Sequence, residues 1–149
     1  MKKMLVVYAT RSGRAIVIGE HIANGAISAG IEVEFINANS IKDDINLKDY
    51  DAFIFGSETE ACDMLPEMRS ILEFADRSSL EGKIGGAYGT FGCSGEGPKQ
   101  IYDTMRIRLK MDMIGGGPLT LESNIPFEMI KHGKDYGKEI ADKLLKKIV

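Results

Sequence analysis

The chain of 149 residues contains no tryptophan, two cysteines and two histidines, and aromatic residues make up 7% of it. Two cysteines are too few for a disulfide scaffold, and no His or Cys cluster has the spacing of a zinc site. No apolar run approaches the roughly 20 residues that span a bilayer, and the run that ends at Tyr8 is too short for a signal peptide. These absences exclude a disulfide-rich, zinc-finger or membrane-spanning protein, and we expect a cytoplasmic location.

The chain also has little excess of either charge, because 19 basic and 22 acidic residues give a formal net charge of −3. A nucleic-acid-binding domain normally has a strong basic excess, so we expect no nucleic-acid partner. Hydrophobic residues amount to 44% of the chain and recur throughout it. That content is sufficient for one packed core, and we expect a single domain over residues 1–149.

Five segments have the composition of β-strands. Met4 to Tyr8 is a continuous apolar run, typical of a central strand buried on both faces, whereas Ile31 to Ile36 alternates apolar and acidic residues as an edge strand does. The other predicted strands are Ala52 to Phe55, Ile84 to Gly89, and a fifth within Met113 to Leu121. Because the fifth contains Gly115-Gly116-Gly117-Pro118, we expect it to be bulged or interrupted.

Helical periodicity fills the intervals between these strands. Helices are predicted over Arg14 to Ala29, from Pro66, from Pro98, and over Phe127 to Ile148, with Asn39 to Tyr50 as loop or short helix. The expected buried residues are Ile18, Ile22, Ala23, Ala26 and Ile27; Met68, Ile71, Leu72 and Ala75; Ile101, Met105 and Leu109; and Ile130, Gly137, Ile140, Ala141, Leu144, Leu145 and Ile148.

Strands that alternate with helices predict a three-layer α/β/α fold with a doubly wound, five-stranded parallel sheet in the order 2-1-3-4-5. Ligands of such sheets bind beyond the carboxyl ends of the strands, beside the topological switch point. The loops after the first, third and fourth strands are therefore the candidate binding site.

The first of these loops runs from Ala9 to Ala15 between a strand and a helix N-terminus. Its backbone N–H groups and the helix dipole can bind a phosphate. Thr10, Ser12 and Gly13 would enclose that phosphate, and Arg11 and Arg14 would add charge at the rim. The alternative is that a hydroxyl only caps the helix. The loop lacks both the Gly-Lys-Ser/Thr ending of a Walker loop and Gly-x-Gly-x-x-Gly, so we expect a monophosphate.

The second loop covers Gly56 to Pro66 and the third covers Gly89 to Pro98. Because their strands are neighbours, both loops border one crevice and could hold a flat ring between them. Taken singly, each also fits a plainer interpretation, an acidic turn for the second and a flexible glycine-rich connection for the third.

Over essentially the whole chain, in order and spacing, three segments resemble the flavin mononucleotide (FMN) loops of the flavodoxin family. They are Tyr8-Ala9-Thr10-Arg11-Ser12-Gly13-Arg14-Ala15, Gly56-Ser57-Glu58-Thr59 through Leu65-Pro66, and Tyr88-Gly89-Thr90-Phe91-Gly92-Cys93-Ser94-Gly95-Glu96. The second and third most resemble the flavodoxin-like module of flavodiiron proteins.

This resemblance implies an FMN-binding protein that passes single electrons between redox partner proteins through transient contacts, as a monomer or weak homodimer. It implies that Thr10, Arg11, Ser12, Gly13, Arg14 and Ala15 bind the FMN phosphate. It places Ser57, Glu58, Thr59, Glu60, Ala61 and Cys62 along one side of the ring, and Thr90, Phe91, Gly92, Cys93, Ser94 and Gly95 along the other.

The chain departs from the family pattern where the ring would stack. Related modules often have Trp at the position of Cys93, and Glu58 and Glu60 replace the usual proline and the aromatic or apolar neighbour around Thr59. Two lost stacking contacts would weaken ring binding about tenfold. Acids close to the ring would also disfavour the anionic reduced flavin, which predicts a low redox potential.

Two other functions fit the same pattern. One is a flavodoxin-like NAD(P)H-dependent FMN or quinone reductase, and the other is a regulatory module that kept the fold without the cofactor. A pair of cysteines on opposing loops, Cys62 and Cys93, could be redox-active or could simply fill space.

Overall fold

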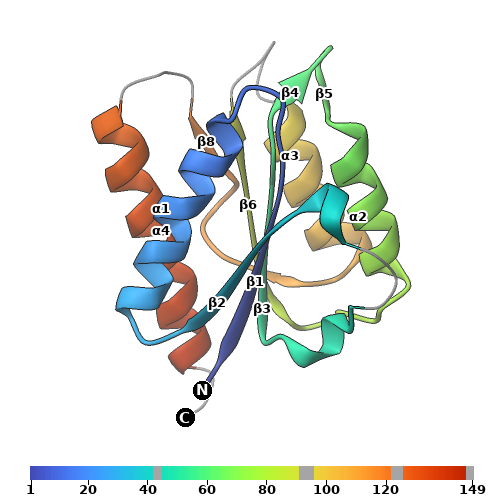
Figure 1. Cartoon of the computed structure of the whole chain (residues 1–149). Helices are drawn as coiled ribbons and strands as arrows, with labels where there is room; N and C mark the ends of the chain where they lie inside the picture. Colours follow the sequence, from blue (N-terminus) through green and yellow to red (C-terminus); the bar gives the residue numbers. More distant parts are fainter. Residues whose placement is uncertain (42–44, 91–95, 122–125, 147–149) are drawn as a thin grey trace.

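The computed structural model describes residues 1–41, 45–90, 96–121 and 126–146, and a parallel sheet forms its middle layer (Figure 1). The strands are β1 (Lys3–Ala9), β2 (Glu32–Asn37), β3 (Ala52–Ser57), β6 (Ile84–Thr90), β7 (Asp112–Met113) and β8 (Leu119–Leu121). Their order is β2-β1-β3-β6-β7, with β8 also beside β6, and all of these pairings are parallel. The predicted order is confirmed.

The fifth strand is interrupted, as the glycine-rich segment predicts. Residues 114–118 separate β7 from β8, and Gly115 lies there with φ of 64°. The two short strands pair with opposite ends of β6, β7 with Ile84 and Gly85 and β8 with Tyr88 to Thr90. One position in the sheet is therefore shared by two pieces of chain.

Helices cover both faces of the sheet (Figure 1). One face packs against α1 (Arg14–Ser28) and α4 (Pro126–Lys146), and the other against α2 (Pro66–Asp76) and α3 (Glu96–Asp103), which continues into the π-turn η3 (Thr104–Arg108). The remaining elements are the short 3-10 turns η1 (Ala38–Ser40) and η2 (Leu47–Asp49) and the small hairpin of β4 (Thr59–Glu60) and β5 (Asp63–Met64). None of the described helices is both long and apolar enough to cross a membrane.

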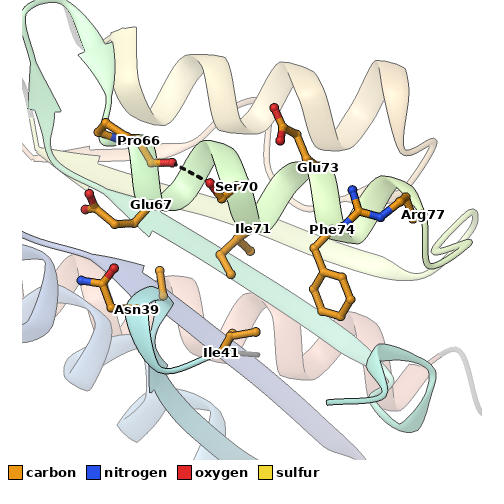
Figure 2. A pocket seen from close by; sticks show the side chains of 10 residues that line it. Asn39, Ile41, Pro66, Glu67, Ser70, Ile71, Glu73, Phe74 and Arg77 are labelled. Atoms are coloured by element: carbon orange, nitrogen blue, oxygen red, sulfur yellow. Dashed lines mark hydrogen bonds between the residues drawn. The ribbon is translucent and has the colours of Figure 1, made fainter. Parts of the chain in front are cut away.

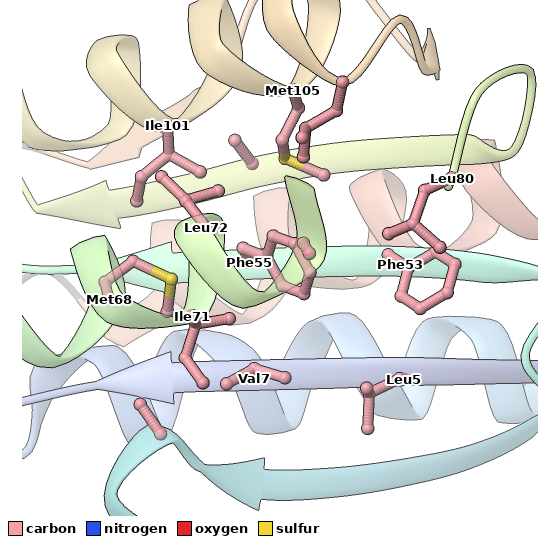
Figure 3. Packing of buried hydrophobic residues seen from close by; sticks show 14 of the residues in the cluster. Leu5, Val7, Phe53, Phe55, Met68, Ile71, Leu72, Leu80, Ile101 and Met105 are labelled. Carbon is pink, nitrogen blue, oxygen red and sulfur yellow. The ribbon is translucent and has the colours of Figure 1, made fainter. Parts of the chain in front are cut away.

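The core is split by the sheet because successive side chains of a strand point to opposite faces. Leu5 and Val7 of β1 belong to the cluster under α2 and α3, whereas Met4 and Val6 belong to the cluster under α1 and α4. Figure 3 shows the first cluster, in which Phe55 lies beneath the buried residues of α2 and α3. This two-sided burial explains the continuous apolar run at the start of the sequence.

Three predicted core positions are wrong. Ile27, Ile130 and Leu145 are 54%, 40% and 37% exposed. Each directly follows a buried helical residue, and one residue turns a helix by about 100°, so these side chains lie beyond the buried stripe. The other described residues of the predicted helical stripes are buried, and Ile148 lies outside the described residues.

Tyr88 connects the sheet to the start of α1. Its ring is fully buried against Gly56, where an added Cβ would lie 2.0 Å from Tyr88 Cε1. Its hydroxyl donates a hydrogen bond of 2.7 Å to the carbonyl oxygen of Ala15. The first turn of α1 is thereby held at the carboxyl edge of the sheet, beside the end of β3.

Candidate anion-binding and cofactor site

The loop between β1 and α1 turns sharply before the helix begins. Gly13 adopts a left-handed conformation with φ of 88°, which glycine adopts without a steric penalty. The Gly13 amide donates to Thr10 Oγ1 at 2.9 Å, and the Arg14 amide donates to Ser12 Oγ at 3.2 Å. The two hydroxyls therefore accept from amides at the entry to the helix, whose N-cap residue is Gly13.

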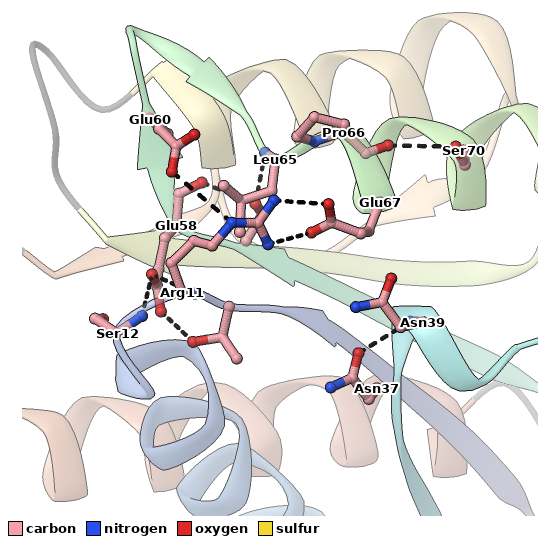
Figure 4. A network of polar contacts seen from close by, with 12 residues as sticks. Arg11, Ser12, Asn37, Asn39, Glu58, Glu60, Leu65, Pro66, Glu67 and Ser70 are labelled. Carbon is pink, nitrogen blue, oxygen red and sulfur yellow. Dashed lines mark hydrogen bonds and ion pairs between the residues drawn. The ribbon is translucent and has the colours of Figure 1, made fainter.

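The carboxylate of Glu58 lies inside this loop (Figure 4). The amides of Arg11 and Ser12 each donate to its Oε1 at 2.9 Å, and the Ala15 amide donates to Oε2 at 3.3 Å. The Thr10 hydroxyl donates a further, short hydrogen bond to Oε2. An anion at the N-terminus of α1 is favoured by these donors and by the helix dipole.

The Glu58 side chain is buried but charged. The residue is 7% exposed, and burial by itself raises the pKa of a carboxyl group. The hydrogen bonds from Thr10, Arg11 and Ser12 outweigh burial and hold the pKa of Glu58 below its ordinary value. The loop is therefore built to stabilise a negative charge.

Arg11 turns its guanidinium away from the loop interior. It forms a two-pronged ion pair with Glu67 at the start of α2, with N···O distances of 2.6 and 2.7 Å, and lies 4.0 Å from Glu60 (Figure 4). The hydrogen bond with Glu67 raises the pKa of Arg11 and lowers that of Glu67. Sequence reasoning missed Glu67, because no local signal indicates which acid meets this arginine.

The second loop is a two-residue hairpin at the end of β3. Ala61 and Cys62 form its turn with φ values of 51° and 62°, the signs that a type I′ turn requires. Ser57 is fully buried, and its hydroxyl donates to the Glu58 carbonyl at 2.8 Å and accepts from the Leu65 amide at 3.0 Å. Ser57 thus holds the two ends of the hairpin together.

The second and third loops are joined through Thr59. Its hydroxyl donates to the Thr90 carbonyl at 3.1 Å and accepts from the Gly97 amide at 3.0 Å. Of the predicted site residues, Phe91, Gly92, Cys93, Ser94 and Gly95 lie outside the described residues. Cys62 is disulfide-bonded.

A groove of about 520 Å³ lies nearby, between η1 and α2 (Figure 2). Asn39 and Ile41 line one side, and Glu67, Ile71 and Phe74 line the other. Glu67, which binds Arg11, is part of this lining, so the groove begins at the rim of the loop. Its lining does not include the donors of residues 10–15.

The structure therefore brings the predicted residues of the first two loops together at the carboxyl edge of the sheet, with Thr90 at their base. The convergent amides of residues 11–15 can bind a small anion. The structure adds one contact that the sequence interpretation does not include, because the carboxylate of Glu58 accepts hydrogen bonds from amides of the first loop.

No protein-family model matches the chain. "Probable flavodoxin 2" of Bacillus subtilis is 30% identical over 149 residues, which cover 93% of this chain and 97% of that protein. A solved structure of a flavodoxin from the domain Archaea is 32% identical with a TM-score of 0.88, and the match covers 96% of this chain and 99% of that one.

A diflavin flavoprotein of Synechocystis sp. is 31% identical over 109 residues, or 70% of this chain. The match covers only 18% of that protein, and a second diflavin flavoprotein is covered to 17%. The chain thus spans less than a fifth of these larger relatives.

Proposed function

Because this chain belongs to the flavodoxin family, we propose that it binds one FMN and carries electrons between redox partner proteins. The observation that supports this most directly is the loop of residues 10–15, whose amides converge on one anion at the carboxyl edge of a parallel sheet. That is where ligands of doubly wound sheets bind. The donor set fits a phosphate, since it already binds a carboxylate.

In this proposal, residues 10–15 hold the phosphate through their amides and hydroxyls. The hairpin of residues 57–62 borders the flavin ring, and Ser57 acts by fixing the hairpin rather than by touching the ring. Residues 90–95 border the opposite side. When bound, FMN supplies the one-electron chemistry, and the protein positions the ring and tunes its electronic environment.

Electron transfer between proteins needs an accessible ring edge and a transient contact, but no catalytic side chain. We propose that the chain acts as one domain, in the cytoplasm, as a monomer or weak homodimer. Its formal net charge of −3 favours partners with a complementary positive surface, because such charges steer encounter. Nucleic acids and membranes are not among the proposed partners.

The proposal is tested by titrating FMN with the flavin-free protein and following flavin fluorescence. We expect quenching that saturates at one FMN per chain, and a yellow complex that, once reduced, passes electrons to an oxidised haem or iron-sulfur protein. A folded protein that quenches no FMN fluorescence refutes the proposal. Steady NAD(P)H consumption by the purified chain with FMN would favour the reductase alternative instead.

A further inference from the structure

All five backbone N–H groups from Arg11 to Ala15 have acceptors within the chain. Three of them donate to the carboxylate of Glu58, and the other two donate to the hydroxyls of Thr10 and Ser12. The amides that a phosphate would use are therefore already engaged. The Glu58 carboxylate, which accepts from three of the five amides, is negatively charged, as a phosphate is.

The Glu58 carboxylate is held there from both sides. The loop provides four hydrogen-bond donors to it. Behind it, the buried Ser57 hydroxyl donates to the Glu58 carbonyl at 2.8 Å, and the Leu65 amide donates to the same hydroxyl. The backbone of residue 58 is thus tied to both ends of the hairpin.

A phosphate and this carboxylate cannot occupy the loop together. Both need the same N–H groups, and two negative charges at hydrogen-bonding distance repel each other. Binding of FMN through its phosphate must therefore displace Glu58 and break its four hydrogen bonds. A flavin without a phosphate has no such requirement.

We propose that the Glu58 carboxylate competes with the cofactor phosphate for the amides of this loop and thereby removes most of the preference of the site for FMN over riboflavin. The carboxylate cancels most of the affinity that a phosphate contributes, so the chain binds FMN and riboflavin with similar affinity. The inference rests on the proposed function, because it requires a flavin at this site.

A simpler role for Glu58 is that of a distant cap on helix α1. A cap alone would change the stability of the protein without changing its preference between two flavins. The ratio of the riboflavin Kd to the FMN Kd therefore separates the two roles, since any general loss of stability affects both constants alike.

The experiment measures both Kd values by fluorescence quenching in the full-length chain and in two variants, Glu58→Ala and Glu58→Gln. Glu58→Ala vacates the loop, and Glu58→Gln keeps the shape but removes the charge, which provides a second reading if the alanine variant folds poorly. Glu73→Gln, on the solvent-exposed side of α2, is the matched control for a change of one charge. A thermal-shift assay with inorganic phosphate probes the loop without any flavin.

In the unmodified chain we expect the two Kd values to agree within about threefold. In Glu58→Ala we expect FMN to bind about 10- to 100-fold more tightly, the range for removing a competitor held by charge-assisted hydrogen bonds, with the riboflavin Kd nearly unchanged. Glu58→Gln should fall between these, and Glu73→Gln should match the unmodified chain. Inorganic phosphate should raise the Tm of Glu58→Ala and leave that of the unmodified chain unchanged.

The inference is overturned if the unmodified chain prefers FMN over riboflavin by 100-fold or more and Glu58→Ala keeps the same ratio. It is also overturned if inorganic phosphate raises the Tm of the unmodified chain and Glu58→Ala equally. Failure of every variant to bind any flavin, with a phosphate response confined to Glu58→Ala, refutes the proposed function and leaves Glu58 identified as the occupant of the loop.

Discussion

Replacement of Glu58 by glutamine should lower the free energy of unfolding of the flavin-free protein at neutral pH. The Glu58 carboxylate accepts from the Thr10 hydroxyl and from the amides of Arg11, Ser12 and Ala15. A glutamine of the same shape keeps one acceptor oxygen, but its NH₂ group would face further donors.

The size of the effect follows from what can replace the lost bonds. A hydrogen bond to a charged group contributes about 1.5–3 kcal/mol net, but the contributions of the four bonds to Glu58 are not additive. Arg11 and Ser12 are exposed, so water can reach their amides, whereas Ala15 is buried. We expect a loss of about 2 kcal/mol, close to the upper range for removal of a helix cap. That is a large part of a typical stability of about 5–15 kcal/mol.

The effect should depend on pH in one direction. Burial raises the pKa of Glu58, but the hydrogen bonds from the first loop outweigh burial, so its folded-state pKa lies below the ordinary value of 4.5. A depressed carboxyl pKa stabilises the fold above the unfolded-state pKa, and this contribution is lost as the pH falls through the folded-state pKa. The unmodified chain should therefore lose its advantage over Glu58→Gln on acidification from about pH 5 downward.

Urea unfolding curves of both proteins and of Glu73→Gln, recorded at neutral pH and at several acidic values, measure this difference. The Glu58→Gln curve should have an unchanged slope and a lower midpoint at pH 7, and the two midpoints should converge in acid. Equal midpoints at every pH would show that the carboxylate does not bind the loop in solution, and the reasoning on Glu58 would then be wrong.

Three further predictions concern the surroundings of the site. Gly56→Ala places a methyl group 2.0 Å from the Tyr88 ring and should cost about 3 kcal/mol of unfolding free energy in urea melts; a loss below 0.5 kcal/mol would contradict the packing. Ala61→Asn should raise the unfolding free energy by about 0.5–1 kcal/mol, because asparagine tolerates positive φ better than alanine, and a lower urea midpoint would argue against that turn. Because Cys62 is disulfide-bonded, Cys62 of the protein unfolded without reductant should resist alkylation by iodoacetamide and become alkylated after reduction, as followed by peptide mass spectrometry; alkylation of Cys62 before reduction would disprove the bond.

Much of the fold could be predicted from local patterns. The run of Met4 to Tyr8 predicts a strand buried on both faces, and Gly115 to Pro118 predicts the interruption of the last strand position. The pattern was less reliable at helix margins. Ile27 and Leu145 are apolar, as core residues are, but their side chains lie about 100° around the helix from the buried stripe. The width of that stripe is set by the neighbouring layers.

The candidate site was predictable in position but only partly in its contacts. The carboxyl ends of parallel strands share one edge of the sheet, so the ends of β1, β3 and β6 had to meet there. The partner of Arg11 and the direction of the Glu58 side chain could not be predicted, because both contacts join residues more than 40 positions apart.

The sequence by itself determined the strands of the main sheet, the helices and the set of loop residues able to bind an anion, since these depend on short-range periodicity and backbone preference. Only the tertiary structure decided which anion the loop holds in the folded chain. That outcome depends on the pairing of β1 with β3, which places the amides of residues 11–15 within reach of Glu58. From the local sequence, Glu58 is only an acidic residue of a turn. In the folded chain its carboxylate accepts a hydrogen bond from the first turn of α1, 43 residues earlier, because the fold brings these distant segments together.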